Sequence, residues 1–99
     1  EKISDLVVEL YGVDDATTII FEDAAIIVVK IAYEEKLTEE LNSTIEKTVL
    51  DEAPGINDVL ITDKSNIFSE INNLVAELLQ GESYDSLVNE IAKIKNKIH

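Results

Sequence analysis

The side chains of this chain that could do chemistry are almost all carboxylates. Among the adjacent acidic pairs along the sequence, four stand out: Asp14-Asp15, Glu22-Asp23, Glu34-Glu35 and Glu39-Glu40. Two carboxylates can work as general acid and base, or cleave a glycosidic bond, only when both face one substrate. Neighbouring side chains on a strand point to opposite faces, and all four pairs fall at expected turns or element ends. We therefore interpret the pairs as solvated surface groups, with no catalytic residue among them.

The other groups that catalysis commonly uses are missing or poorly placed. The chain has no cysteine and no arginine, and its one histidine, His99, is the last residue. The usual pairs of nucleophile and base cannot be assembled from this set. We assign His99 no role, because chain ends rarely belong to a structured site. The sequence therefore predicts a protein that is not an enzyme, with no catalytic residues.

Metal and phosphate sites also lack their usual sequence signals. The nearest group of oxygen ligands, Asp58, Asp63 and Asn66, does not have the spacing of a calcium-binding loop. Each of the three glycines stands at a different expected element boundary, so no phosphate-binding glycine loop exists. We expect no metal site, no cofactor and no cofactor-binding residues. Diffuse binding of cations to the acidic surface stays open.

The charge balance limits the possible partners. The chain has 21 acidic residues against eight lysines, which gives a net charge of -13. Such a field repels nucleic acid backbones and anionic lipid, so we expect no nucleic acid partner. Cationic partners, metal ions or a polybasic surface stay open. The simpler interpretation is that the acidic side chains keep a small domain soluble.

The first third of the chain predicts a helix followed by a hairpin. Apolar residues recur at helical spacing over residues 3–11, including Tyr11, and Gly12 is expected to end this helix. Two β-rich runs follow at residues 16–21 and 25–32. Glu22-Asp23 between them is not a preferred pair for a tight primed turn, so we expect a connection looser than two residues.

The second of these runs is apolar on both faces, which indicates a strand covered from both sides. Thr38 is a candidate N-cap for a helix that has Glu39 and Glu40 in its first turn and ends at Pro54-Gly55. Its buried stripe would be Leu41, Ile45, Thr48 and Val49. Residues 56–62 then predict a third strand.

The last third of the chain predicts two amphipathic helices. The first would run from a Ser65 cap to Gly81, and the second would follow a Ser83 cap. Lys93, Lys95 and Lys97 near the end complement a helix C-terminus, and we interpret them as structural. The apolar stripes are Ile67, Phe68, Ile71, Leu74, Val75 and Leu78 in one helix, and Tyr84, Leu87, Val88, Ile91, Ile94 and Ile98 in the other.

These elements define an α+β fold, with a helix-strand-strand-helix-strand core, a three-stranded sheet and two C-terminal helices. We expect a single domain over residues 1–99, in which residues 1–63 form the core and residues 64–99 a helical hairpin. The first two helices should pack on the sheet. The last two could cover the remaining side of the second strand or form an appended hairpin.

Several motifs along the chain carry a family resemblance. They are G-V-D-D-A at residues 12–16, the apolar hairpin, P-G-I-N-D-V-L-I-T-D at residues 54–63 and L-L-Q-G-E at residues 78–82. Together they resemble the YhcN/YlaJ family of sporulation lipoproteins over nearly the whole chain. The chain departs from the family where Glu22-Asp23 replaces a common Gly-Asn turn, and it shows no signal peptide or lipid-accepting cysteine. We expect Glu1 to follow an omitted or removed leader.

The resemblance implies a non-enzymatic, germination-associated lipoprotein domain, located outside the cytoplasm at the spore membrane or envelope. It implies protein partners or self-association, and membrane attachment only through a lipid anchor. The core order also resembles the BON domain and the ring-building motif, whose modules associate through sheet edges and helix faces. The alternative hypothesis is a module that binds a small molecule or cation between the sheet and the C-terminal helices.

Overall fold

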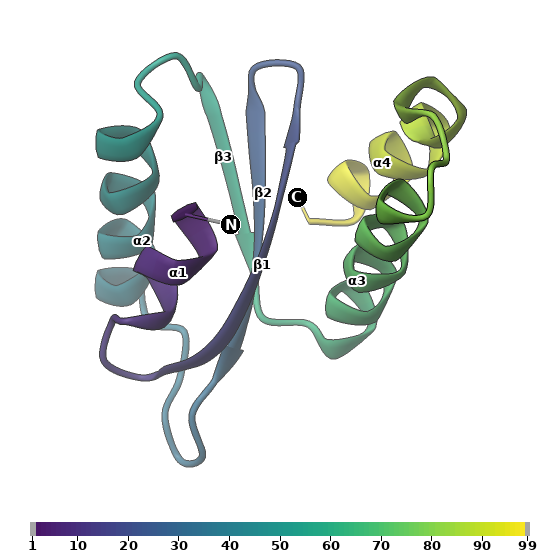
Figure 1. Cartoon of the computed structure of the whole chain (residues 1–99). Helices are drawn as coiled ribbons and strands as arrows, with labels where there is room; N and C mark the ends of the chain where they lie inside the picture. Colours follow the sequence, from purple (N-terminus) through teal and green to yellow (C-terminus); the bar gives the residue numbers. More distant parts are fainter. Residues whose placement is uncertain (1, 99) are drawn as a thin grey trace.

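A mixed three-stranded sheet lies between two layers of helices (Figure 1). The computed structural model describes residues 2–98, without the side chains of Tyr84 and Ser86. The observed order confirms the expected α+β fold. The elements are α1 (Lys2–Val8), β1 (Val13–Phe21), β2 (Ala24–Ile31), α2 (Glu39–Glu52), β3 (Asp58–Thr62), α3 (Ser65–Leu79) and α4 (Tyr84–Ile98).

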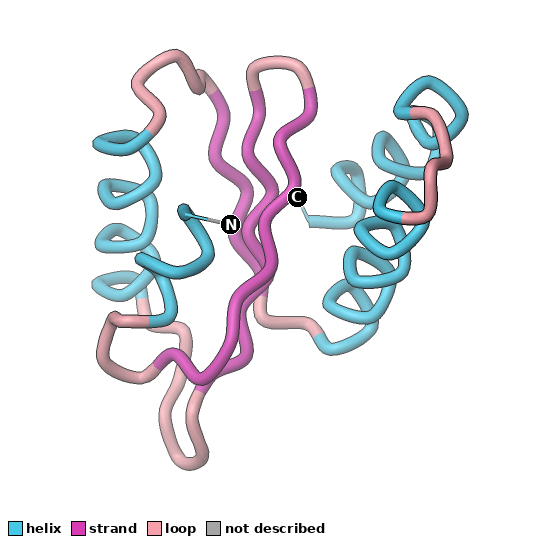
Figure 2. Tube along the Cα trace, viewed as in Figure 1, coloured by secondary structure: helices cyan, strands magenta, loops and turns pink. Residues whose placement is uncertain are grey.

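Strand β2 is the centre of the sheet. It pairs antiparallel with β1 through the hairpin and parallel with β3, and α2 makes the connection between β2 and β3 (Figure 2). Every residue of β2 from Ala24 to Val29 is buried. Both faces of this strand are therefore covered, as its two-sided apolar sequence predicted.

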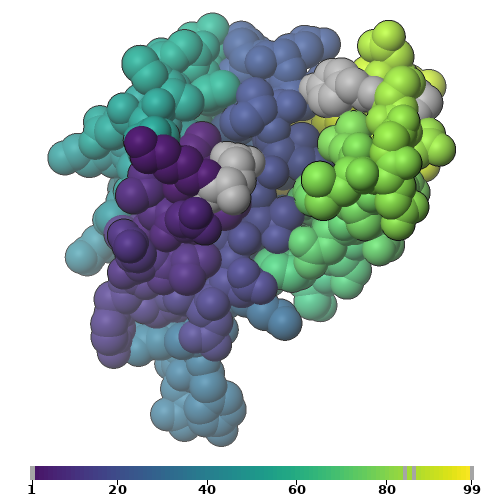
Figure 3. Space-filling view, in the orientation of Figure 1, coloured from purple at the N-terminus to yellow at the C-terminus, as the bar shows by residue number. Residues whose placement is uncertain are grey.

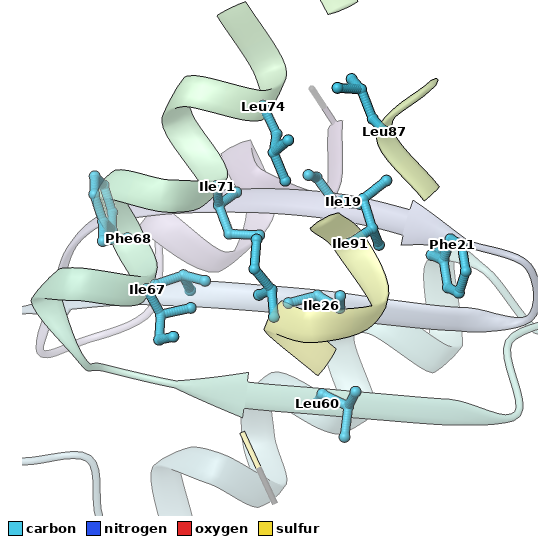
Figure 4. Close-up of a cluster of buried hydrophobic side chains, with 12 residues drawn as sticks. Ile19, Phe21, Ile26, Leu60, Ile67, Phe68, Ile71, Leu74, Leu87 and Ile91 are labelled. Atoms are coloured by element: carbon cyan, nitrogen blue, oxygen red, sulfur yellow. The ribbon is translucent and has the colours of Figure 1, made fainter. Parts of the chain in front are cut away.

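Two separate apolar cores cover the two faces of the sheet. On one face α1 and α2 pack over Ala25, Ile27 and Val29, with Ile45 and Val49 at the centre of α2. On the other face α3 and α4 pack over the sheet (Figure 4). Of the two arrangements that the sequence left open, the structure has the C-terminal helices on the remaining face of β2. The buried side chains on that face are Ile19, Phe21, Ile26, Val28, Leu60, Ile67, Phe68, Ile71, Leu74, Leu87, Ile91 and Ile94. The side chain of Tyr84 and all of His99 lie outside the described residues.

The ends of three elements differ by two or more residues from the sequence-based expectation. Helix α1 ends at Val8, well before Gly12. The amides of Glu9 and Leu10 donate hydrogen bonds to carbonyls three residues earlier in the chain, which is the pattern of a turn and not of an α-helix. Strand β1 begins at Val13, three residues before the expected start at residue 16, with an irregularity in register between Val13 and Asp15. Strand β3 begins at Asp58 instead of residue 56.

The helix caps are partly as expected. Thr38 is the N-cap of α2, and its Oγ1 accepts a hydrogen bond from the Leu41 amide at 3.1 Å. The Ser65 cap was wrong, because the carbonyl of Lys64 already accepts from the Phe68 amide at 3.0 Å and makes Lys64 the N-cap. Helix α3 ends just before Gly81, which takes a left-handed φ of +98°.

The hairpin turn is tight, which corrects the expectation of a looser connection. Phe21 pairs directly with Ala24, so only two residues form the turn, and Glu22 takes a left-handed φ of 55°. Asp23 holds this turn against the start of β3. Its carbonyl accepts from the amide of Asn57 at 2.8 Å, and its Oδ2 accepts from Asn57 Nδ2 at 3.0 Å. These bonds offset the unfavourable backbone of Glu22.

The bond between Asn57 and Asp23 predicts a pH-dependent contribution to stability. The Asn57 side chain donates to the carboxylate and lowers the pKa of Asp23 below its ordinary value. A lowered folded-state pKa gives stability that is present above the ordinary pKa of about 3.9 and is lost as the pH falls through the folded value. We therefore expect Asn57→Ala to lower the urea midpoint at neutral pH and to have little effect at pH values below the folded pKa.

The control for this prediction is Asn42→Ala, which removes an exposed amide from α2. Its effect on the urea midpoint should not change between neutral and acidic pH. A loss of stability in Asn57→Ala that stays the same at both pH values would show that the carboxylate is not involved.

Candidate interaction surface

The acidic pairs lie on separate segments of the surface, and Glu35 and Glu40, from two of the pairs, line one open groove. All eight carboxylates are exposed, and they lie on β1, in the hairpin turn, after β2 and at the start of α2. Asp58, from the group of possible calcium ligands, lies with its Oδ2 3.8 Å from Lys95 Nζ. Within residues 2–98, no three histidine or acidic side chains are arranged to hold a metal ion.

Apolar side chains fill the centre of the space between the sheet and the C-terminal helices. At its edge, an open pocket of about 410 Å³ lies between the end of β2 and the start of α3, with Lys30, Asp63 and Phe68 among its lining residues. A pocket of about 330 Å³ lies along the seam of α3 and α4, and Glu70, Glu77, Glu90 and Lys93 are among its lining residues. Lys97 Nζ donates to Glu70 Oε1 at 2.9 Å across this seam. Lys95 and Lys97 thus form ion pairs that hold α4 to its neighbours, in agreement with a structural role.

The most unusual surface feature is a pair of exposed tyrosines. Tyr11 is 84% exposed and Tyr33 is 90% exposed, whereas both phenylalanines are buried. The two tyrosines lie on adjacent segments, because the amide of Ala32 donates to the carbonyl of Gly12 at 2.8 Å. The loop after β2, which contains Tyr33, projects from the lower end of the molecule (Figure 3).

The turn after α1 places Tyr11 at this end. Gly12 has a φ of +91°, which a side chain would oppose, and it carries the chain from the helix into β1. Tyr11 was expected on the apolar face of the first helix. That expectation was wrong, because the helix stops three residues earlier and the ring points to solvent, where its hydroxyl donates to Glu35 Oε1 at 3.0 Å.

An open groove of about 330 Å³ lies beside Tyr11, between the turn after α1 and the start of α2. Its chemistry is mixed, with two leucines, two carboxylates and one lysine. We call Tyr11, Tyr33 and this groove the tyrosine surface. The residues that line the groove include Leu10, Tyr11, Glu35, Lys36, Glu40 and Leu41. The sequence reasoning missed this surface, and the available signal was an aromatic residue next to each expected element end.

The hydrogen bond from Tyr11 to Glu35 predicts a change in the titration of the phenol. The bond and the nearby negative charge raise the pKa of Tyr11 above its ordinary value of about 10. A raised folded-state pKa gives stability that is complete below that ordinary value and is lost as the pH rises through the folded value. We expect Glu35→Gln to lower the phenol pKa, measured by phenolate absorbance with Tyr33 and Tyr84 replaced by Phe. An unchanged titration would contradict the bond, and Glu46→Gln is the matched control.

The fold and surface define a small layered α+β domain with an exposed aromatic end. A comparison with protein families shows what kind of domain this is. Residues 1–99 match the family described as sporulation lipoprotein YhcN/YlaJ, so the chain belongs to this family, as the sequence motifs indicated. A search of curated proteins finds no match.

Family membership indicates a spore-associated, extracytoplasmic and membrane-anchored location. The helices described between residues 2 and 98 are all too short or too polar to cross a bilayer.

Proposed function

We propose that this domain is a non-enzymatic, germination-associated module of the spore envelope that acts through protein-protein contacts at the tyrosine surface. The observation that carries the proposal is the exposure of Tyr11 and Tyr33 on adjacent segments. Tyrosine is enriched at protein interfaces, because its ring gives contact area and its hydroxyl a hydrogen bond at low entropic cost. Family membership supports the spore location of the proposed contact.

Features of the sheet edges favour a different protein as the partner over a second copy of this chain. On β1 the amide of Ala16 is already bonded to Asp15 Oδ1 at 2.9 Å, and the register there is irregular. On the other edge β3 has only five residues. Bulges, short strands and edge charges are devices that prevent pairing between sheets. The net charge of -13 also makes two copies repel one another.

Site-specific cross-linking tests this proposal. A photo-reactive phenylalanine analogue would replace Tyr33 in the intact lipoprotein in sporulating cells. The control position is Leu79, which is 83% exposed at the C-terminal end of α3, far from the loop of Tyr33 (Figure 1). We expect one discrete cross-linked product from position 33 and none of the same mass from position 79. Absence of a product, or the same product from both positions, would refute the proposal.

Analytical ultracentrifugation of the purified domain addresses self-association separately. We expect a monomer over the whole concentration range. A concentration-dependent dimer that is lost in Tyr33→Ser would mean that the tyrosine surface binds a second copy of the chain.

A further inference from the structure

The groove beside Tyr11 combines an apolar lining with carboxylates. Leu10 and Leu41 are half-buried and provide aliphatic contact area. Glu35 and Glu40 are exposed, and the exposed ring of Tyr11 lies along the same groove. A long side chain with an aliphatic stem and a cationic head matches this arrangement, because its stem packs on apolar surface while its head stays near acidic or aromatic groups.

Within residues 2–98, the carboxylates of the groove form no ion pair with a lysine. In the described part of the chain the lysine ion pairs involve Glu52, Asp58 and Glu70, and none involves Glu35 or Glu40. Tyr11 donates to only one oxygen of Glu35. Lys36 is the one cation among the groove residues, and it does not pair with either carboxylate within 4.0 Å.

We propose that the tyrosine surface binds a lysine- or arginine-bearing segment of the partner protein. A basic side chain lays its stem on Leu10 and Leu41, and its head lies between the carboxylates of Glu35 and Glu40 and the ring of Tyr11. Tyr33 makes a second aromatic contact with the same segment. The inference rests on the proposed function and adds the chemistry of the partner.

Charge complementarity selects this partner over others. An acidic or phosphorylated segment would be repelled, because the protein has a net charge of -13. A free metal ion lacks the aliphatic stem, and within residues 2–98 the acids are not arranged as metal ligands. Steering by the negative field would also speed encounter with a basic segment and make the association rate sensitive to salt.

The test is binding of a short oligolysine peptide, measured by calorimetry at low and physiological salt. Tyr11→Ser/Tyr33→Ser should weaken binding roughly threefold to tenfold, which corresponds to the loss of one or two exposed cation-π contacts. Glu35→Gln/Glu40→Gln should weaken it by a similar factor, on the order of threefold. Lys36→Gln should tighten binding, because it removes the one repulsive charge from the groove.

Matched controls separate a site from general attraction of a polycation to an acidic protein. Glu46→Gln/Asp51→Asn makes the same charge change on exposed positions of α2 outside the groove residues. This double variant should keep nearly full affinity, and an oligoglutamate peptide should not bind. Circular dichroism and urea midpoints verify that each variant is folded.

Equal loss of affinity in the groove variant and in the control variant would overturn the inference, as would the absence of any effect of Lys36→Gln. Different results would refute the basic chemistry of the partner and the protein contact itself. If position 33 still cross-links to a partner and oligolysine does not bind to the groove, the basic segment is wrong and the protein contact remains. If position 33 gives no product, the proposed function itself falls.

Discussion

Residues 1–63 alone are expected to remain unfolded in water. Removing α3 and α4 uncovers one complete face of the sheet, including five buried side chains: Ile19, Phe21, Ile26, Val28 and Leu60. Burial of such side chains is worth about 1.5–3 kcal/mol each, which together is comparable to the whole stability of a small domain, about 5–15 kcal/mol. Far-ultraviolet circular dichroism and urea titration of the fragment should show no cooperative transition.

The complementary fragment, residues 64–99, is the control. When it is added in excess, the two fragments should assemble and recover a cooperative unfolding transition, because the lost contacts are restored by mass action. A cooperative transition in residues 1–63 alone would mean that the C-terminal helices are an appendage and not part of the core.

Truncation of either of two adjacent isoleucines in β2 should be costly, and each truncation affects a different core. Ile26 points into the core under α3 and α4, and Ile27 into the core under α1 and α2, and both are completely buried. We expect Ile26→Ala and Ile27→Ala each to lower the free energy of unfolding by about 2–5 kcal/mol, because a cavity remains in a packed core. Urea denaturation measures both.

The double variant tests whether the two cores are independent. Although the residues are neighbours in sequence, their side chains share no core cluster, so their effects should add within about 0.5 kcal/mol if enough stability remains to measure. The control Ile20→Ala changes a side chain of β1 that is only partly buried and should cost much less. A small effect of Ile26→Ala would contradict the packing of α3 and α4 on the sheet.

The order of elements could be predicted because the periodic patterns are strong. The continuous apolar run of β2 indicated a strand covered on both sides, and the stripes of α3 and α4 indicated helices with a face to bury. The sequence did not decide whether those helices close on the sheet, since any apolar face can cover another. That choice depends on the summed packing of side chains far apart in the chain.

The sequence-based predictions were wrong at positions where tertiary contacts override the local preferences of the residues. The turn at Glu22 takes a backbone conformation that its own residue type disfavours, because Asn57 and Asp58 hold Asp23 from β3. The tyrosine surface was not predicted from the sequence because it also depends on tertiary contacts. Tyr11 and Glu35 become neighbours only through the register of the hairpin, in which Val13 lies opposite Ile31.

The position of α3 and α4 after the sheet in the chain has a consequence for folding. The central strand comes before the helices that shield its second face, so this face stays uncovered until α3 and α4 can pack on it. Until that packing occurs, a partly folded chain exposes one whole apolar face of its sheet, and such exposed apolar surface promotes aggregation.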